Sequence, residues 1–291
     1  MAIKTSEVNT AHAVKKPKKS GQWYRSAIQI FFFSLVALIT INVILAKYGW
    51  SIPFLSTASL HAICPFGGIV SIYNFAALGT FVQKIHSSSF ILMLTAILLA
   101  VFFGPVICGW ICPLGTFQEW ISKIGKKIFK KRFNNFIPLK LDRYLRYIRY
   151  ISLILVVYFT ATTARLVFQT YDPYFALFNF WSGEVAIAAY IFLGASIVLS
   201  FFTERPYCKY ICPYGALLGI FNLFRIFKIR RKASTCIDCK KCDNTCPMNI
   251  TVSKARTVYS HQCISCMKCT SEYSCPVAAT VEFSTKGEKK A

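Results

Sequence analysis

The sequence has few charged residues and very few acidic ones. Only 15% of its 291 residues are charged, and 34 Lys and Arg residues stand against 11 Asp and Glu residues. It also lacks paired carboxylates, a phosphate-binding loop and a nucleophile beside a base, so any chemistry is expected to come from bound cofactors. Because 55% of the residues are hydrophobic, the composition excludes an ordinary soluble domain and indicates a membrane protein.

Four apolar stretches predict transmembrane helices, at about 27–46, 90–107, 150–168 and 185–202. Each is long enough, or nearly so, for the ~20 residues that cross a hydrocarbon core. Residues from about 52 to 83 are apolar but broken by proline and glycine. We expect a re-entrant segment there, with a loop outside the membrane as the alternative. The expected fold is mainly α, a polytopic membrane domain at 21–230 followed by a small α+β domain at 235–285.

The positive charge lies in three blocks beside these stretches, at 15–25, 123–149 and 225–232. The positive-inside rule then predicts a multi-pass protein of the inner (cytoplasmic) membrane with both termini in the cytoplasm. Charge in these positions indicates contact with lipid and not with nucleic acid. Residues 1–20 are expected to be a disordered basic tail, residues 230–234 a short basic hinge, and residues 286–291 a charged tail.

Thirteen cysteines stand out against this background. Cysteines that face a reducing cytoplasm indicate metal binding or thiol redox chemistry and not disulfides. Eight form two runs after residue 235, and the first run matches the spacing of bacterial two-cluster ferredoxins, in which each run gives its last cysteine to the other cluster. The predicted [4Fe–4S] ligand sets are Cys236, Cys239, Cys242 and Cys275, and Cys246, Cys263, Cys266 and Cys269. The last spacing is longer than in the pattern, which predicts a small bulge at 271–274.

Four more cysteines form two C-x3-C-P pairs at the ends of two predicted spans. These are Cys108 with Cys112 and Cys208 with Cys212. Because proline is tolerated in a first helical turn, the second cysteine of each pair is expected at a break between helices, where free N–H groups face its sulfur. Four thiolates predict a third [4Fe–4S] cluster in the membrane domain. Separate thiol redox or metal-relay centres, and structural thiols, are the alternatives.

The Cys-Pro motif occurs once more without a paired cysteine, at Cys64, with His61 nearby. These two residues are candidates for a redox site on the outer side of the membrane. Cys64 can alternatively join a cluster, pair with its copy in a homo-oligomer, line a flavin or quinone site, or pack as a small apolar residue. Glu204 and Arg205 precede Cys208, and two interpretations stay open: an ion pair, or an arginine that raises a cluster potential.

Three motifs together resemble a known family: Cys108-Gly-Trp-Ile-Cys112-Pro-Leu-Gly, Cys208-Lys-Tyr-Ile-Cys212-Pro-Tyr-Gly and the double ferredoxin run. They are similar to the membrane-bound polyferredoxins of the NapH type, which include the C-terminal half of NosR, over about residues 25–285. The resemblance implies four spans, both ends in the cytoplasm, and electron transfer between the membrane pool and a partner. The element around Cys64 looks more like versions associated with flavin-bearing extracytoplasmic proteins.

The sequence as a whole predicts a membrane-bound iron–sulfur electron-transfer protein, and the family resemblance implies a quinol dehydrogenase-like subunit of an oxidoreductase complex. Electrons would pass between a cytoplasmic partner or ferredoxin and a membrane or extracytoplasmic partner that carries quinone, flavin or haem. Two alternatives stay open. One is a copper or iron reductase or assembly accessory protein, and the other is a membrane anchor subunit whose clusters are structural.

Overall fold

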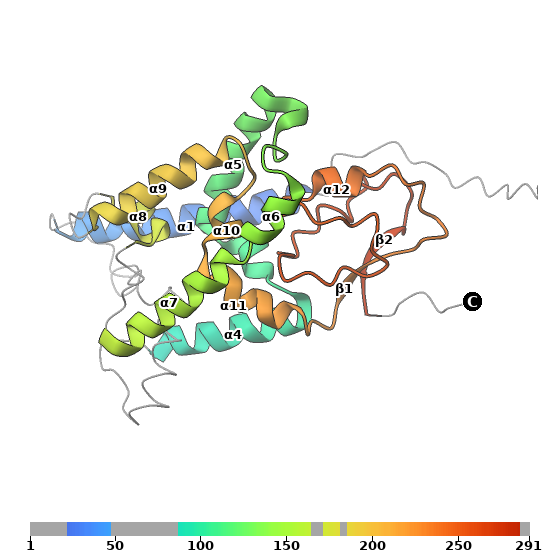
Figure 1. Cartoon of the computed structure of the whole chain (residues 1–291). Helices are drawn as coiled ribbons and strands as arrows, with labels where there is room; N and C mark the ends of the chain where they lie inside the picture. Colours follow the sequence, from blue (N-terminus) through green and yellow to red (C-terminus); the bar gives the residue numbers. More distant parts are fainter. Residues whose placement is uncertain (1–21, 48–86, 164–170, 181–184, 286–291) are drawn as a thin grey trace, which may run out of the picture.

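The computed structural model describes residues 22–47, 87–163, 171–180 and 185–285, and this part of the chain is mostly helical (Figure 1). The predicted re-entrant segment, with Cys64 and His61, lies outside the described residues. The two predicted tails lie outside them as well.

A helix lies at each of the four predicted spans. These helices are α1 (Trp23–Lys47), α4 (Ser87–Phe103), α7 (Ile148–Thr163) and α9 (Ile187–Ser200). Within the described residues, one segment, Trp23–Ala46, is long and apolar enough to cross a membrane, while Ile91–Phe103 and Ile187–Ser200 are apolar but shorter. The described chain therefore has one clear membrane-spanning candidate, at its N-terminal end.

Shorter helices lie between these four or follow the last of them, and most of the shorter helices begin with a proline. They are α5 (Pro113–Phe129), α6 (Leu139–Leu145), α8 (Pro173–Phe178), α10 (Pro206–Tyr210) and α11 (Pro213–Asn222). Proline suits a first helical turn because its φ is already helical and its missing N–H has no partner to lose there. Helix α5 runs across the bundle, not along it (Figure 1). It exposes Ile124 and Ile128 beside lysines, as a helix on a membrane surface does.

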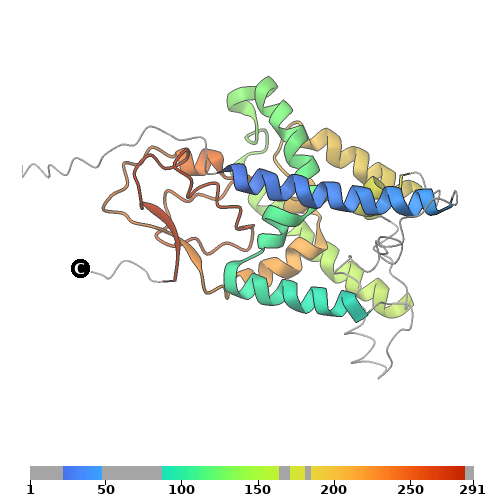
Figure 2. The same cartoon turned by 180° about the vertical axis from the view of Figure 1, so that it is seen from behind.

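The C-terminal domain lies at one end of the helical bundle (Figure 2). It contains the short helix α12 (Lys241–Thr245) and an antiparallel pair of strands, β1 (Lys228–Arg231) and β2 (Val281–Ser284). The expected hinge at 230–234 therefore begins inside a strand. Basic residues flank Ile229, so the sequence lacks the alternation of apolar and polar residues that predicts a strand. Ile229 is nevertheless buried, and it pairs with Phe283 across the sheet. Pairing with a segment about fifty residues later, and not local sequence, defines this strand.

One hydrophobic core joins the two parts of the chain. It combines Ala96 and Ala100 of α4 and Leu218 of α11 with Met248 and Ile264 of the C-terminal domain. A shared core of this kind fixes the orientation of the domain on the bundle, because close-packed side chains leave little freedom to shift.

Candidate functional site

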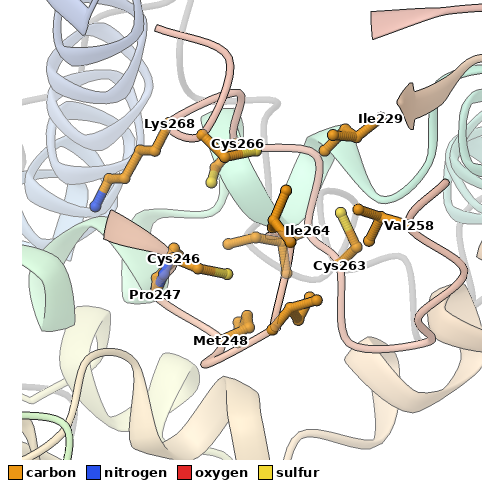
Figure 3. A pocket seen from close by; sticks show the side chains of 12 residues that line it. Ile229, Cys246, Pro247, Met248, Val258, Cys263, Ile264, Cys266 and Lys268 are labelled. Atoms are coloured by element: carbon orange, nitrogen blue, oxygen red, sulfur yellow. The ribbon is translucent and has the colours of Figure 1, made fainter. Parts of the chain in front are cut away.

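The eight cysteines of the C-terminal domain divide between two pockets. Pocket A is lined by Cys236, Cys239, Cys242 and Cys275, and pocket B by Cys246, Cys263, Cys266 and Cys269. Figure 3 shows the sulfurs of Cys246, Cys263 and Cys266 directed toward pocket B, while the amine of Lys268 points away toward α1. Each pocket thus contains the four cysteines of one predicted ligand set.

The two cysteine runs have matching backbone geometry. Asp238 and Ser265 each lie two residues after the first cysteine of a run, and their φ angles are 49° and 48°. Lys240 and Met267 each follow the second cysteine, with φ angles of 54° and 55°. Residues other than glycine rarely adopt this left-handed region. Its recurrence at equivalent positions indicates two copies of one loop, which turns successive cysteines toward the same side.

The two additional residues before Cys275 form a hydrogen-bonded turn. The N–H groups of Ser274 and Cys275 both donate to the carbonyl of Ser271 at 2.9 Å, and Ser271 Oγ donates to the carbonyl of Lys268 at 2.7 Å. The irregularity predicted at 271–274 is this turn. It carries the chain from pocket B, which Lys268 lines, to pocket A, which Cys275 lines.

Thiols in both pockets resist deprotonation in the absence of a metal. Burial raises the pKa of Cys246 to about 12, with a contribution from Cys266, and burial raises the pKa of Cys242 to about 12. Thiolates in such surroundings need positive charge, which the irons of a cluster supply, so the donor set suits an iron–sulfur cluster. Within the described residues, no three His, Cys, Asp or Glu side chains lie close enough to hold a single metal ion. A cubane differs because each of its four irons takes one thiolate.

The other four described cysteines lie at two helix breaks of matching geometry. Cys112 precedes α5 and Cys212 precedes α11, and the N–H of each donates to a carbonyl five residues earlier, that of Ile107 or Tyr207, at 2.9 Å. This π-type bond closes one helix immediately before proline starts the next. The N–H of Gly215 donates to Cys212 Sγ at 3.3 Å, as expected for a sulfur at a helix N-terminus with free donors.

The two breaks bring their cysteines together in buried surroundings. Burial raises the pKa of Cys212 well above its ordinary value, and repulsion from Cys208, Cys108 and Cys112 adds to the rise. Burial likewise raises the pKa of Cys108, with contributions from Cys112 and Cys208. The four thiols therefore lie within electrostatic range of one another, and we call them the four-cysteine site.

A buried ionic cluster lies beside the four-cysteine site, and sequence analysis missed its central residue. Glu119 of α5 pairs with Arg25 of α1, with Arg205 at 2.8 Å and with Lys268 at 3.1 Å. Burial opposes the ionisation of Glu119, yet Lys268, Arg205 and Arg25 hold the pKa of its carboxyl well below the usual range. These residues come from four separate segments. The signal available in the sequence was a rare acidic residue inside a basic helix.

The same arginines hold the backbone that carries Cys108. Arg205 Nη1 donates to the carbonyl of Cys108, and Arg25 Nε donates to the carbonyl of Gly109 at 3.1 Å. Arg205 has a left-handed φ of 54°, which is uncommon for a side chain of its size and sets the turn into α10. The ionic cluster therefore positions one half of the four-cysteine site.

The structure tests one of the two interpretations of Glu204 and Arg205, that they form an ion pair. Both residues form ion pairs, but not with each other. Arg205 pairs with Glu119, and Glu204 pairs with Lys268 and, at 3.1 Å, with Lys126.

Residues 260–268, which carry Cys263 and Cys266, insert against the helical domain. Trp110 Nε1 donates to the carbonyl of Ser265 at 3.0 Å. Asn222 Nδ2 donates to the carbonyls of Ser260 and Cys263 at 2.7 and 3.1 Å. A Cβ on Gly109 would lie 2.5 Å from the carbonyl oxygen of Ile264. Pocket B is thus in close contact with the short π-helix η2 (Ile107–Ile111), which joins Cys108 to Cys112.

The family described as 4Fe-4S binding domain, Fer4_5, matches residues 85–132 and 185–232. Each matched stretch contains one C-x3-C-P pair, so the match falls on the four-cysteine site and not on the C-terminal runs. The duplicated match agrees with the matching geometry of the two helix breaks.

Known proteins resemble the chain over most of its length. The candidate electron transport protein YccM of Escherichia coli K12 is 30% identical over 283 residues, covering 91% of this chain and 76% of that protein. An uncharacterized protein of Methanocaldococcus jannaschii, MJ0750, is 32% identical over 233 residues, covering 78% and 91%. The ferredoxin-type protein NapH of Haemophilus influenzae is 24% identical over 181 residues, covering 58% and 60%.

No solved structure matches the chain. The resemblance predicted from the cysteine motifs is confirmed by the family match and by these relatives. The family description and the names of two of these relatives refer to 4Fe-4S binding, to a ferredoxin type and to electron transport. The chain belongs to a family of membrane-associated 4Fe-4S ferredoxin-type proteins.

Proposed function

We propose that the chain is a membrane-spanning electron relay with three [4Fe–4S] clusters, bound at pocket A, pocket B and the four-cysteine site. Clusters of this type supply one-electron couples. The polypeptide contributes the order of the sites, their shielding from water and the charges around them. In this proposal electrons pass between a cytoplasmic partner and a membrane or extracytoplasmic partner, with pocket B between pocket A and the four-cysteine site.

The observation that carries this proposal is that neighbouring sites share hydrophobic cores. Cys242 lines pocket A and Cys263 lines pocket B, and both belong to one buried core. Cys266 of pocket B and Cys108 of the four-cysteine site belong to a second core, together with Ile264. Continuous packing keeps the sites close and excludes water between them. It supports a linear order with pocket B in the middle.

The exposure of the cysteines supports pocket A as the entry point. Cys239 is exposed, whereas Cys108 is buried. Ile237 and Tyr273 are also exposed, at 57% and 61%, and both flank cysteines of pocket A. A soluble partner can therefore approach pocket A directly, whereas none of the cysteines of the four-cysteine site is exposed.

The proposal includes four membrane spans with both termini in the cytoplasm. Large apolar side chains are exposed on every helix at a predicted span, among them Phe31, Ile91, Ile154 and Ile191, each more than 60% exposed. Soluble proteins rarely expose apolar surface on this scale, while helices that face lipid do so as a rule. The basic blocks beside these helices support the orientation.

Sites at the inner face do not reach across a hydrocarbon core of about 30 Å. The proposal therefore assigns the outer half of the path to the region of Cys64 and His61, or to a quinone, flavin or haem in a partner subunit. A flavoprotein or quinone as the outer partner rests on the family resemblance alone.

Iron and acid-labile sulfide, measured together with EPR on the anaerobically purified chain, test the proposal. We expect about twelve irons per wild-type chain, and about eight in Cys112→Ser with the EPR signals of the C-terminal clusters retained. Loss of iron in Cys64→Ser would make Cys64 a cluster ligand.

About eight irons in the wild type, unchanged in Cys112→Ser, would contradict a cluster at the four-cysteine site. Copper or iron bound there without sulfide, and released by thiol reagents, would favour the metal-handling alternative.

A further inference from the structure

Arg225 is a buried arginine that contacts a cysteine of pocket B. It lies between α11 and β1, and its side chain is 2% exposed. Its Nη1 donates to Cys263 Sγ at 3.3 Å and to Ser265 Oγ at 3.3 Å, and its Nη2 donates to the carbonyl of Val258 at 2.8 Å. A guanidinium from the end of the helical domain therefore donates directly to a sulfur that lines pocket B.

Within the described residues, no ion pair joins Arg225 to a carboxylate. The buried Arg25, Arg205 and Lys209 each have one, from Glu119 or Asp142, whereas the buried Arg149, like Arg225, has none among the described residues. An unpaired buried cation is strongly destabilising, so negative charge is expected beside Arg225. Four thiolates would give a bound cubane a net negative charge. Arg225 would contact such a cubane through the sulfur of Cys263.

Pocket A provides the opposite surroundings. The sulfur of Cys242 lies 3.7 Å from Asp243 Oδ1, so the charged group in contact with this sulfur is a carboxylate and not a guanidinium. The cations that line pocket A, Arg231 and Lys240, reach solvent, where water and salt screen their charge. Positive charge and hydrogen bonds at sulfur favour the reduced state of a cluster, and negative charge favours the oxidised state.

We propose that Arg225 raises the reduction potential of the cluster at pocket B above that of the cluster at pocket A. The inference rests on the proposed relay and adds a direction to it. Electrons then move more readily from pocket A to pocket B, toward the four-cysteine site, than back. Arg225 is a positioning residue, because it acts on the electron through the sulfur of Cys263 and touches no partner.

An anaerobic redox titration followed by EPR, on the full chain in detergent, tests this inference. In Arg225→Gln we expect one C-terminal cluster to fall in potential by at least about 59 mV, a tenfold change for a one-electron couple. The other C-terminal cluster keeps its potential. Arg225→Lys keeps the charge but loses the planar fork, so we expect a smaller fall. Asp243→Asn should raise the potential of the second signal, which assigns that signal to pocket A.

Arg149→Gln is the matched control. Arg149 is also 2% exposed, and it holds the same segment through the carbonyl of His261 at 2.8 Å and Gln262 Oε1 at 3.1 Å. Its hydrogen bonds do not reach Cys263. If Arg225 acts on the cluster itself, Arg149→Gln leaves the potentials of both C-terminal clusters unchanged.

Unchanged potentials in Arg225→Gln, with iron content retained, would overturn the inference and leave the relay standing. An equal fall in Arg149→Gln would also overturn it, because docking of the segment would then be the cause. If Arg225→Gln loses iron, Arg225→Lys decides, and an unchanged potential there overturns the inference. Iron content too low for a cluster at pocket B in the wild type would instead overturn the proposed function, so the two failures differ.

Discussion

The C-terminal pockets and the four-cysteine site assemble their cysteines in two different ways. Three of the four cysteines of each pocket come from one short run with repeated left-handed turns. The four-cysteine site instead takes two cysteines from each of two helix breaks about a hundred residues apart. Local loop geometry therefore builds the pockets, whereas packing between distant helices builds the four-cysteine site.

This difference predicts which substitutions destabilise each region. The C-terminal domain is small, so the clusters proposed for its two pockets would contribute much of its folding free energy. The four-cysteine site lies among helices that pack against one another, and it depends on buried contacts such as those of Glu119. Substitutions in one region should therefore affect folding and iron content differently from substitutions in the other.

Removing one cysteine from each region is expected to have the largest effect. Cys242→Ser and Cys112→Ser should each lose about four irons, but with different consequences for folding. We expect the C-terminal domain of Cys242→Ser to become sensitive to protease, because it loses a cluster that stabilises it. In Cys112→Ser the domain should stay resistant. Limited proteolysis with iron analysis checks this, and equal sensitivity of the two variants would remove the distinction.

Neutralising Glu119 is expected to have the next largest effect. Glu119→Gln leaves Arg25, Arg205 and Lys268 without their shared carboxylate, and breaking a buried pair costs about 3–5 kcal/mol. The matched control is Lys126→Ala, which removes the partially exposed cation that pairs with Glu204 and should cost less than about 1 kcal/mol. Thermal unfolding followed by circular dichroism compares them. Similar losses in both variants would show that burial does not set the strength of the ionic cluster.

A smaller effect is expected at the contact between the two regions. In Gly109→Ala the new methyl would meet the carbonyl of Ile264 at 2.5 Å, and overpacking of this kind costs about 1–3 kcal/mol. Gly194→Ala on α9 is the control. Its Cβ would meet nothing within 4 Å, and replacing a helical glycine gains about 0.5–1 kcal/mol. Protease sensitivity of residues 260–268 should rise in Gly109→Ala and not in Gly194→Ala.

The last prediction concerns how the stability given by Glu119 depends on pH. The pKa of Glu119 is held below its ordinary value of 4.5 by Lys268, Arg205 and Arg25 against the effect of burial. A carboxyl with a lowered folded pKa contributes stability that is fully present above its unfolded pKa and is lost as pH falls through the folded pKa. Wild type and Glu119→Gln should therefore differ by a constant amount above pH 4.5 and converge below it. A constant difference down to strong acid would contradict this assignment.

Cysteine spacing predicted which three cysteines of each run gather at one pocket, because each run lies within about a dozen residues, where local turns decide which side chains meet. Apolar composition placed the four long helices within a few residues of their observed positions for the same reason. The fourth cysteine of each pocket comes from the other run, and its place followed from the pattern of two-cluster ferredoxins. Glu119 and Arg225 could not be found this way. Their partners lie far along the sequence, and nothing local distinguishes a buried arginine from one that faces lipid.

The strand β1 shows the same limit. The basic residues around Ile229 predicted a hinge, since charge at a domain boundary usually marks an exposed linker. The segment forms a strand because Val281–Ser284 pairs with it, and this partner becomes apparent only when the chain is folded. The duplicated helix breaks were visible in the sequence as a repeat, whereas the ionic cluster that positions them was not.

Reoxidation of the C-terminal clusters in inverted native membrane vesicles tests the relay most directly. A pulse of membrane-impermeant reductant loads the clusters from the exposed cytoplasmic side, and freeze-quench EPR follows the loss of their signals. We expect Cys212→Ser to keep both C-terminal clusters but to reoxidise them far more slowly than the wild type does. Reoxidation at the wild-type rate in Cys212→Ser would contradict the passage of electrons through the four-cysteine site.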